Sequence, residues 1–478
     1  MNYGIITYII GWVLNFEALF MAPACLVAVV YQEKEGFSLF AVMLLCLVLG
    51  VLLTRKKRGG KSMYAREGFV AVALCWIVLS AFGALPFVIA GSIPSYIDAL
   101  FEVVSGFTTT GSSILPEVES MPHCLLFWRS FTHWIGGMGV LVFLMAILPL
   151  TGGSSMYLMK AESPGPSVGK LVPKVKSTAM LLYKMYLGLS ILQLVFLLLG
   201  GMPLFGSITT MFGTAGTGGF GIKNDSIGGY STYIQVVVTV FMILFGVNFN
   251  IYYLLLKRRF KEAAKSAEVR IYFAIILCSI ILITINISGM FPSVWKALQQ
   301  SAFQVGSIIT TTGFATTDFD LWPSFSKTIL VLLMFIGACA GSTGGGIKVS
   351  RIVILFKSIL KELDVIVHPH NVKKLKMDGR IVEHSVVRSV NVFLVSYLFI
   401  FAISVLLISL DNFDFTTNFT AVAATINNIG PGLEMVGPTQ NFGMFSNFSK
   451  IVLTFDMLVG RLELFPLLIL FSKNTWSK

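Results

Sequence analysis

The 478-residue sequence has very little charge for its length. Only 12% of its residues are charged, whereas 55% are hydrophobic. Soluble domains carry roughly a quarter charged residues, so this scarcity excludes a soluble globular protein. Apolar runs of about 20 residues recur throughout the chain, as a bilayer span requires. We therefore expect an all-α polytopic membrane protein.

The sequence also lacks the patterns of redox, metal and catalytic sites. Its six cysteines form no CxxC pair and lie mostly within apolar runs, where they suit small packing positions. The five histidines show no metal-ligand spacing. No cluster of His, Asp and Glu falls at a common depth of the spans. We expect neither an enzyme nor a resident cofactor in this chain.

Two glycine-rich segments match nucleotide-binding motifs only in part. Residues 216–221 fit G-x-G-x-x-G, but no strand–helix–strand context surrounds them. Residues 341–346 resemble the start of a P-loop, but Ile347 intervenes before Lys348, and the GK[ST] ending is absent. The chain is therefore not expected to bind a nucleotide itself.

The net charge of +12 is unevenly placed. Basic residues cluster in four segments, at 55–66, 160–184, 257–270 and 348–388. The segments between them carry few basic and several acidic residues, among them Glu117 and Asp318. By the positive-inside rule, the basic segments are cytoplasmic and the acidic ones external. No interleaving of aromatic and basic residues favours nucleic-acid binding.

One order of segments recurs four times after an N-terminal pair of spans at 3–31 and 37–53. Each repeat reads as a span, a short external half-helix, a polar glycine-bearing turn and a second span. The expected division is a two-span hairpin (1–62) and four pore repeats (63–160, 161–262, 263–365 and 366–478).

The half-helices are too short to cross a bilayer. They are expected near residues 95–107, 203–212, 292–309 and 414–425. Irregular backbone at membrane depth is tolerated only where it is buried in protein or lines a wet cavity. Four re-entrant turns therefore predict one shared central pore. The second spans are expected at 123–150, 231–256, 326–360 and 448–471, with a break only in the third.

The four turns are rich in threonine and glycine. Their sequences are FTTTGSS (107–113), GTAGTGGFG (213–221), ITTTGF (309–314) and TINNIGPG (425–432), and we take Gly111, Gly218, Gly313 and Gly430 as equivalent. A ring of backbone carbonyls can replace the water shell of a cation. Glycine allows the dihedrals that such a turn needs. Threonine and glycine also serve helix packing in membranes, but four matched turns favour a cation-binding ring.

Two of these segments give the chain its resemblance to a known family. FEVVSGFTTTG (101–111) and NNIGPG (427–432) resemble the Trk/Ktr/HKT superfamily of potassium transporters, over essentially the whole chain. The N-terminal pair of spans is similar to the Trk branch. The resemblance implies four span–pore helix–span repeats around one pore and potassium uptake across a bacterial cytoplasmic (inner) membrane. It implies that the potassium-binding filter consists of Thr109, Thr110, Gly111, Thr217, Gly218, Thr311, Thr312, Gly313, Asn428, Ile429 and Gly430.

A glycine-rich stretch interrupts the second span of the third repeat. Residues 337–346 read GACAGSTGGG, and such a break must be buried or line a cavity. Arg461 lies in the last span, where a charge is costly. The resemblance implies a gate formed by this intramembrane loop and Arg461, with the loop residues Gly341, Ser342, Thr343, Gly344, Gly345, Gly346 and Lys348. The alternatives are a helix-packing face for the glycines and a structural ion pair for Arg461 with Asp456 or Glu463.

The resemblance also implies partners. They are a second copy of the chain, a cytoplasmic nucleotide-binding regulatory subunit of the RCK/KTN kind, and membrane lipid. The basic segments 160–184 and 257–270 are candidate docking surfaces for the regulator. A broken-helix secondary transporter of another small cation, such as sodium, is the alternative. The uncharged turns and the common orientation of the repeats favour the filter. The sequence leaves open whether uptake is coupled to protons or sodium.

Overall fold

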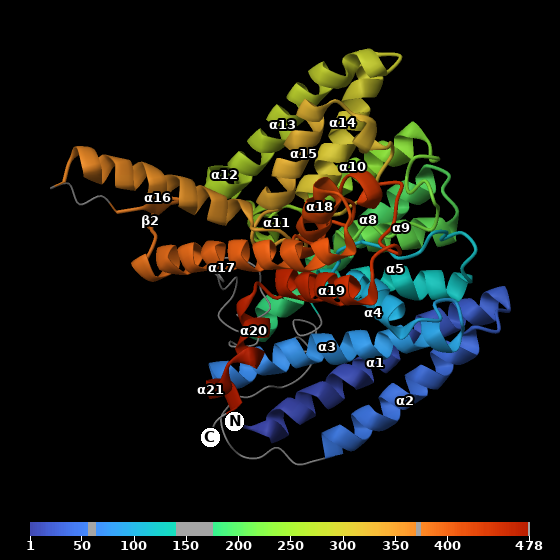
Figure 1. Ribbon diagram of the computed structural model, residues 1–478. Helices are drawn as coiled ribbons and strands as arrows, with labels where there is room; N and C mark the ends of the chain where they lie inside the picture. Colours follow the sequence, from blue (N-terminus) through green and yellow to red (C-terminus); the bar gives the residue numbers. More distant parts are fainter. Residues whose placement is uncertain (56–63, 140–174, 370–373, 477–478) are drawn as a thin grey trace.

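The computed structural model describes residues 1–55, 64–139, 175–369 and 374–476 (Figure 1). Within these residues the structure is helical apart from one antiparallel hairpin, in which β1 (Lys376–Met377) pairs with β2 (Arg380–Ile381). The basic residues at 56–63 and 160–174, and the expected span beyond residue 139, lie outside the described residues.

The N-terminal hairpin consists of α1 (Tyr3–Tyr31) and α2 (Gly36–Arg55), as predicted. Glycines allow the two helices to pack closely, because a Cβ on Gly11 would lie 3.0 Å from the carbonyl oxygen of Gly50. Helix α1 also packs against α3 and α5 of the first repeat. The hairpin is therefore joined to the pore repeats and does not form a separate body (Figure 1).

The first span of each repeat forms a long apolar helix. These helices are α3 (Ala65–Ile89), α8 (Val175–Leu199), α13 (Ala267–Ile287) and α17 (His384–Ile408). With α1 and α2 they make six helices in the described part of the chain that are long and apolar enough to cross a membrane. Large apolar side chains such as Ile285 and Leu406 are exposed on them, as a surface facing lipid requires.

The four expected half-helices are present. They are α4 (Tyr96–Phe107), α9 (Leu204–Gly216), α14 (Val294–Ile309) and α18 (Phe415–Ile426). At about 1.5 Å per residue, helices of this length span roughly 18–24 Å and do not cross a bilayer. Ser95, Ser293 and Asp414 cap three of them by accepting the backbone N–H three residues on.

The second-helix segments of the four repeats differ from the predicted continuous spans in the second and fourth repeats. The segments are α5 (His123–Gly137), α10 (Thr232–Phe245) with α11 (Phe249–Leu256), α15 (Ser324–Ile336) with α16 (Val349–Val367), and α19 (Asn447–Arg461) with α20 (Phe465–Leu468). Helices α10 and α11 meet at 91°. The prediction of continuous spans at 231–256 and 448–471 was therefore wrong, whereas the predicted break in the third repeat is confirmed. Helix α5 ends at Gly137.

In the first and fourth repeats, a glycine lies just before the end of the second helix. A Cβ on Gly136 would clash with the carbonyl oxygen of Phe107, and a Cβ on Gly460 would clash with that of Ile426. Phe107 and Ile426 are the last residues of their half-helices. The second helix thus touches the end of its own half-helix before it stops. Single glycines within apolar runs look like packing positions in a sequence, so the breaks were not foreseen.

Short elements complete the described fold. They are α12 (Phe260–Lys265), α21 (Lys473–Trp476) and five 3₁₀ turns, η1 (Ser288–Met290), η2 (Phe319–Leu321), η3 (Ser409–Asp411), η4 (Glu434–Val436) and η5 (Ile469–Phe471). Helix α16, the β1–β2 hairpin and the start of α17 project together from the body (Figure 1).

Candidate functional site

The four polar turns adopt one backbone conformation. Each half-helix ends in a left-handed residue with φ between 55° and 58°, namely Thr109, Thr217, Thr311 and Asn428. Two residues later each turn has a glycine with φ between 77° and 104°, namely Gly111, Gly219, Gly313 and Gly430. The residue between them donates its N–H to the carbonyl five residues back at 2.8 Å in all four turns, from Thr110, Gly218, Thr312 and Ile429.

These dihedrals correct the alignment of the second turn. Gly219, and not Gly218 as expected, is equivalent to Gly111. Gly218 instead takes the position of Thr110, because its N–H makes the same bond, to the carbonyl of Gly213. The second turn contains glycine at 216, 218 and 219. The left-handed dihedral of Thr217 identifies Gly219, two residues later, as the glycine that corresponds to Gly111.

The turns end their half-helices in a Schellman-type cap, in which the left-handed position usually holds glycine. Here it holds threonine three times and asparagine once. A β-branched residue in this region is strained by about 1–3 kcal/mol, and the strain persists only where the surroundings fix it. All four side chains are fully buried. Hydroxyl pairs brace two turns, with Thr108 and Thr110 Oγ1 atoms 2.8 Å apart and those of Thr310 and Thr312 2.7 Å apart.

The four turns close into a ring, which we call the turn ring (residues 109–111, 217–219, 311–313 and 428–430). A Cβ on Gly111 would clash with the backbone oxygen of Gly218. In the same sense, a Cβ on Gly219 would clash with Thr312 O, and one on Gly313 with Ile429 O. A Cβ on Gly430 would lie 3.0 Å from Thr110 O, which completes the circuit. Each glycine thus lets its turn approach a carbonyl of the next.

Side chains join neighbouring turns in the ring. Asn428 Nδ2 donates to Thr110 Oγ1 at 2.9 Å, and Ser112 Oγ donates to the carbonyl of Gly430 at 3.0 Å. His133, which the sequence analysis did not single out, joins the first two repeats. Its Nδ1 lies 2.7 Å from Gly106 O, and its Nε2 accepts the N–H of Phe220 at 3.2 Å. These partners require a neutral imidazole with its proton on Nδ1.

The ring supplies oxygen without fixed charge. No carboxylate lies within the four turns, and the described residues contain no cluster of His, Cys, Asp or Glu that could hold a metal ion. The C-terminal ends of the half-helices, which carry partial negative charge, lead into the ring. Backbone carbonyls in this arrangement can replace the water shell of a cation and release the cation again.

The glycine loop (residues 337–348) forms the predicted break between α15 and α16. Its ends are tied together, because Lys348 donates its backbone N–H to Ile336 O at 3.0 Å and Val349 donates to Ala338 O at 3.1 Å. Gly337, Gly341 and Gly346 have φ between 70° and 74°, which a residue with a side chain rarely adopts. The loop is therefore a closed, specifically folded segment.

The glycine loop packs directly against the third and fourth turns. The N–H of Gly345 donates to Thr311 Oγ1 at 2.6 Å. A Cβ on Gly344 would lie 2.8 Å from Thr310 O, and one on Gly345 would lie 2.5 Å from Asn427 O. Lys348 Nζ donates to the carbonyl of Gly344 within the loop. The close contact explains why glycine is needed at 344 and 345.

Arg461 connects the glycine loop to the first repeat. Its guanidinium donates to Thr343 O at 2.9 Å, to Gly137 O at 3.1 Å and to Gly136 O. The loop reaches the second repeat as well, since Thr343 Oγ1 donates to Phe245 O at 3.3 Å. The sequence analysis placed the gate candidates in repeats three and four, whereas their contacts involve all four repeats.

Two charged residues near the loop, Arg351 and Glu268, were missed, and Glu463 was considered only as a partner of Arg461. Arg351 forms a partly buried ion pair with Glu463. Glu268 accepts the N–H groups of Ala340 at 2.6 Å and Ser350 at 3.2 Å, so it holds both ends of the loop region. Charged residues next to apolar spans were the available signal, but the sequence did not show which of them meet.

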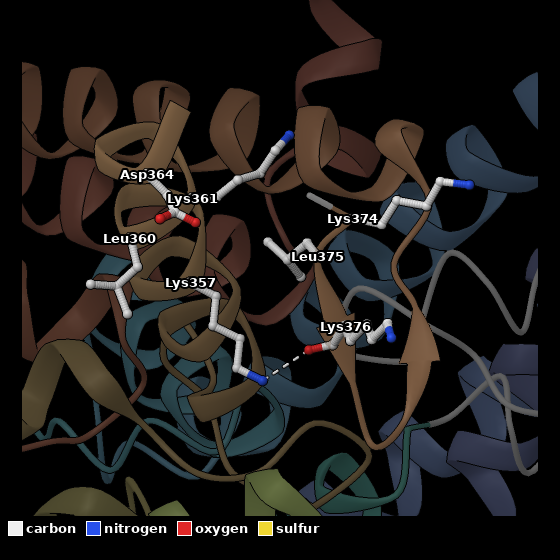
Figure 2. Close-up of a pocket in the computed structure, with 7 residues that line it drawn as sticks. All are labelled: Lys357, Leu360, Lys361, Asp364, Lys374, Leu375 and Lys376. Carbon is white, nitrogen blue, oxygen red and sulfur yellow. Dashed lines mark hydrogen bonds between the residues drawn. The ribbon is translucent and has the colours of Figure 1, made fainter. Parts of the chain in front are cut away.

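A shallow pocket lies away from the turn ring, between α16 and the β1–β2 hairpin (Figure 2). It encloses about 220 Å³, and Lys357 Nζ donates across it to Lys376 O at 2.9 Å. Its lining contains four lysines and none of the predicted site residues; the lining is Lys357, Leu360, Lys361, Asp364, Lys374, Leu375 and Lys376.

Comparisons with known proteins point to one family. The family model TrkH, described as cation transport protein, matches residues 35–478. The chain is 37% identical to the Trk system potassium uptake protein TrkH of Salmonella typhimurium and to that of Escherichia coli, with all of each chain covered. It is 35% identical to Trk system potassium uptake protein TrkG of Escherichia coli, over 99% of this chain and 98% of that one.

The fold agrees as well. A crystal structure of the potassium transporter TrkH from Vibrio parahaemolyticus superposes with a TM-score of 0.89 at 34% identity, and each chain is covered completely. The predicted class, a multi-pass all-α membrane transport protein that is not an enzyme, is confirmed. The chain belongs to the TrkH family of cation transport proteins.

Proposed function

We propose that this chain is the membrane subunit of a potassium uptake system in a bacterial cytoplasmic membrane. The observation that carries the proposal is the closed turn ring, in which four equivalent glycines each meet a carbonyl of the next turn. The names of the relatives, all described as potassium uptake proteins, support potassium as the ion. Potassium is the transported ion and not a resident cofactor.

In this proposal the turn ring is the potassium-binding filter. Its binding residues are Thr109, Thr110, Gly111, Thr217, Gly218, Thr311, Thr312, Gly313, Asn428, Ile429 and Gly430, to which the backbone conformation adds Gly219. Potassium sheds its water against the carbonyls of these residues. The half-helices and the hydrogen bonds between turns hold the carbonyls in place. The repeat boundaries given above belong to the same proposal.

The gate in this proposal lies on the inner side of the ring. Residues Gly341, Ser342, Thr343, Gly344, Gly345, Gly346 and Lys348 of the glycine loop obstruct the path, and Arg461 holds the loop through Thr343. The charge of Arg461 also opposes a passing cation. Opening requires the loop to leave Thr311 and Asn427, and it breaks the bond to Thr311 Oγ1 and the bond from Arg461 to Thr343 O.

The proposal includes partners. The chain forms a homodimer within membrane lipid and binds a cytoplasmic nucleotide-binding regulatory subunit of the RCK/KTN kind. The exposed basic residues Lys257, Arg258 and Arg259 offer that subunit a docking surface. Alanine at all three positions should abolish co-purification of the regulator, and unchanged co-purification would remove this surface from the proposal.

A growth experiment tests the function. An uptake-deficient bacterium that expresses the wild-type chain should grow at low potassium, and the Gly219→Ala variant should not grow, because its methyl group clashes with Thr312 O. Gly379→Ala is the matched control. Gly379 has the same φ of 77°, but no atom lies within 4 Å of its Cβ position.

The outcomes separate the candidate functions. Growth of the Gly219→Ala strain at low potassium would contradict the filter. A wild-type chain that accumulates sodium and does not rescue growth would favour the alternative, a broken-helix secondary transporter of sodium.

A further inference from the structure

A buried ion pair lies behind the first turn. Glu102 is on the half-helix α4, nine residues before Gly111, and Arg129 is on α5. Arg129 Nε donates to Glu102 Oε1 at 2.7 Å, and the two side chains are 3% and 0% exposed. Neither residue belongs to the turn ring or to the gate proposed above.

The carboxylate of Glu102 holds the outer end of the first turn. Its Oε1 accepts the hydroxyl of Ser113 at 2.8 Å, and its Oε2 accepts the N–H of Ile114 at 2.9 Å. These residues lie two and three positions after Gly111 along the chain. A shift of the Gly111 carbonyl would therefore strain charge-assisted hydrogen bonds, which are stronger than neutral ones.

Arg129 holds the corresponding part of the second turn. Its Nη1 donates to Gly221 O at 3.1 Å, and its guanidinium lies 3.5 Å from the centroid of the Phe220 ring. Phe220 and Gly221 follow Gly219 directly along the chain. Through the ion pair, the outer ends of the first and second turns are tied to each other.

The half-helices behind the third and fourth turns supply uncharged groups, and the one carboxylate contact nearby comes from outside them, where Asp320 Oδ2 accepts the N–H of Glu434 at 3.1 Å. In the third repeat Gln304, nine residues before Gly313, donates to Thr317 O at 3.3 Å. In the fourth repeat Thr420 Oγ1 accepts the N–H of Leu433 at 3.0 Å. A buried ion pair is not needed for stability, because uncharged packing is often as stable. The presence of an ion pair at this junction indicates that the first and second turns need a fixed position relative to each other.

We propose that Glu102 and Arg129 form a positioning clamp that sets the preference of the ring for potassium over sodium. The inference rests on the proposed function, because it assigns selectivity to the same ring. Sodium is smaller, so its coordination requires carbonyls of neighbouring turns to move inward. The clamp opposes that movement at the junction of the first and second turns, whereas potassium is coordinated without it.

Ion fluxes in proteoliposomes test the clamp. Glu102→Gln keeps the size of the side chain but removes the charge that binds Arg129, Ser113 and Ile114. We expect potassium influx to stay within about twofold of wild type, while the ratio of potassium to sodium influx falls about tenfold, as a loss of about 1.4 kcal/mol in discrimination produces. Arg129→Lys keeps the charge but loses the hydrogen bond from Nη1 to Gly221 O, and it should give a smaller fall.

The matched control is Glu262→Gln. Glu262 pairs with Arg259 at 2.5 Å, but this pair is exposed and far along the chain from any turn. Its removal should leave the flux ratio unchanged. If Glu102→Gln does not accumulate in the membrane, Ser113→Ala replaces it, since this variant removes one hydrogen bond of the same carboxylate and leaves the ion pair intact.

The outcomes are distinguishable. A flux ratio equal to wild type in Glu102→Gln, or in Ser113→Ala where that variant is used, overturns the clamp. A wild-type chain without preference for potassium contradicts the proposed function itself. A fall in both fluxes by the same factor assigns the pair to folding alone and also overturns the clamp.

Discussion

The first and third turns have almost the same sequence and the same backbone, yet they are attached to the protein differently. Thr109 and Thr311 share a left-handed φ of 56° and 58°. Thr311 Oγ1 accepts the N–H of Gly345 from the glycine loop, whereas Thr109 Oγ1 has no hydrogen-bond partner among the described residues. Behind the turns, Glu102 holds the first and Gln304 the third.

This difference shows that a ring with a nearly symmetric backbone can have different attachments, and therefore different roles, in each repeat. The backbone bonds that shape the turns recur in every repeat, so the carbonyls are presented equally. The side chains around them do not recur. We infer that the ring provides coordination through its shared backbone, while one repeat supplies the loop and another supplies the arginine that holds it.

The largest expected effect comes from removing the arginine that holds the loop. Arg461→Ala deletes the hydrogen bonds to Thr343, Gly136 and Gly137. Charge-assisted bonds are worth about 1.5–3 kcal/mol, so we expect cation flux through the isolated chain to rise about tenfold or more. Flux into proteoliposomes measures it, with Arg388→Ala at an exposed site as the control. An unchanged flux would remove Arg461 from the gate.

A smaller effect separates the first turn from the third. Thr311→Val replaces the hydroxyl that binds Gly345 with a methyl group of similar size. The lost bond is worth about 0.5–1.5 kcal/mol, so flux through the closed state should rise about two- to tenfold. Thr109→Val is the matched control, because Thr109 makes no such bond. Equal effects of the two substitutions would show that the loop does not depend on the third turn.

The smallest expected effect is on the pH dependence of stability, and it distinguishes the fourth half-helix from the others. Burial raises the pKa of Asp414, but hydrogen bonds from Thr417 outweigh it, so the pKa lies below its ordinary value. The ionised cap therefore stabilises α18 fully above the unfolded pKa of about 3.9, and this stabilisation is lost as pH falls through the lowered folded value. Asp414→Asn keeps the cap without the charge.

Thermal unfolding between pH 7 and pH 3 measures this effect. The midpoint for wild type should exceed that for Asp414→Asn at pH 7, and the gap should narrow as pH falls below about 4, towards the lowered folded pKa. The first and third half-helices are capped by Ser95 and Ser293, which do not titrate in this range. Ser95→Asn should therefore change stability by an amount independent of pH. A pH-independent gap for Asp414→Asn would contradict the assignment.

Much of the architecture could be predicted because it depends on local patterns. Each half-helix was placed within a few residues, since short segments between long apolar runs and polar glycine-bearing turns are visible in the sequence. The breaks after Phe245 and Arg461 were not predicted. They depend on a contact between the second helix and the end of a half-helix, which the sequence does not display.

The candidate site, like the fold, could be predicted only in part. The threonines and glycines of the turns were recognised, but the equivalence of Gly219 required the dihedrals of Thr217 and its neighbours. Arg461 was recognised as a costly charge, but its partners at Gly136 and Thr343 lie 325 and 118 residues away along the chain. His133 and Arg129 gained significance only through contacts between repeats, and Glu102 through its ion pair with Arg129.

The sequence by itself determined that this chain crosses a membrane repeatedly and that four polar turns interrupt it. Hydrophobicity, length and turn composition are sufficient for those conclusions, because each acts within about 20 residues. Only the tertiary structure decided which glycine meets which carbonyl, where the second helices stop and which residues hold the glycine loop. These features follow from close approaches between distant segments, where the absence of a single Cβ lets two backbones touch.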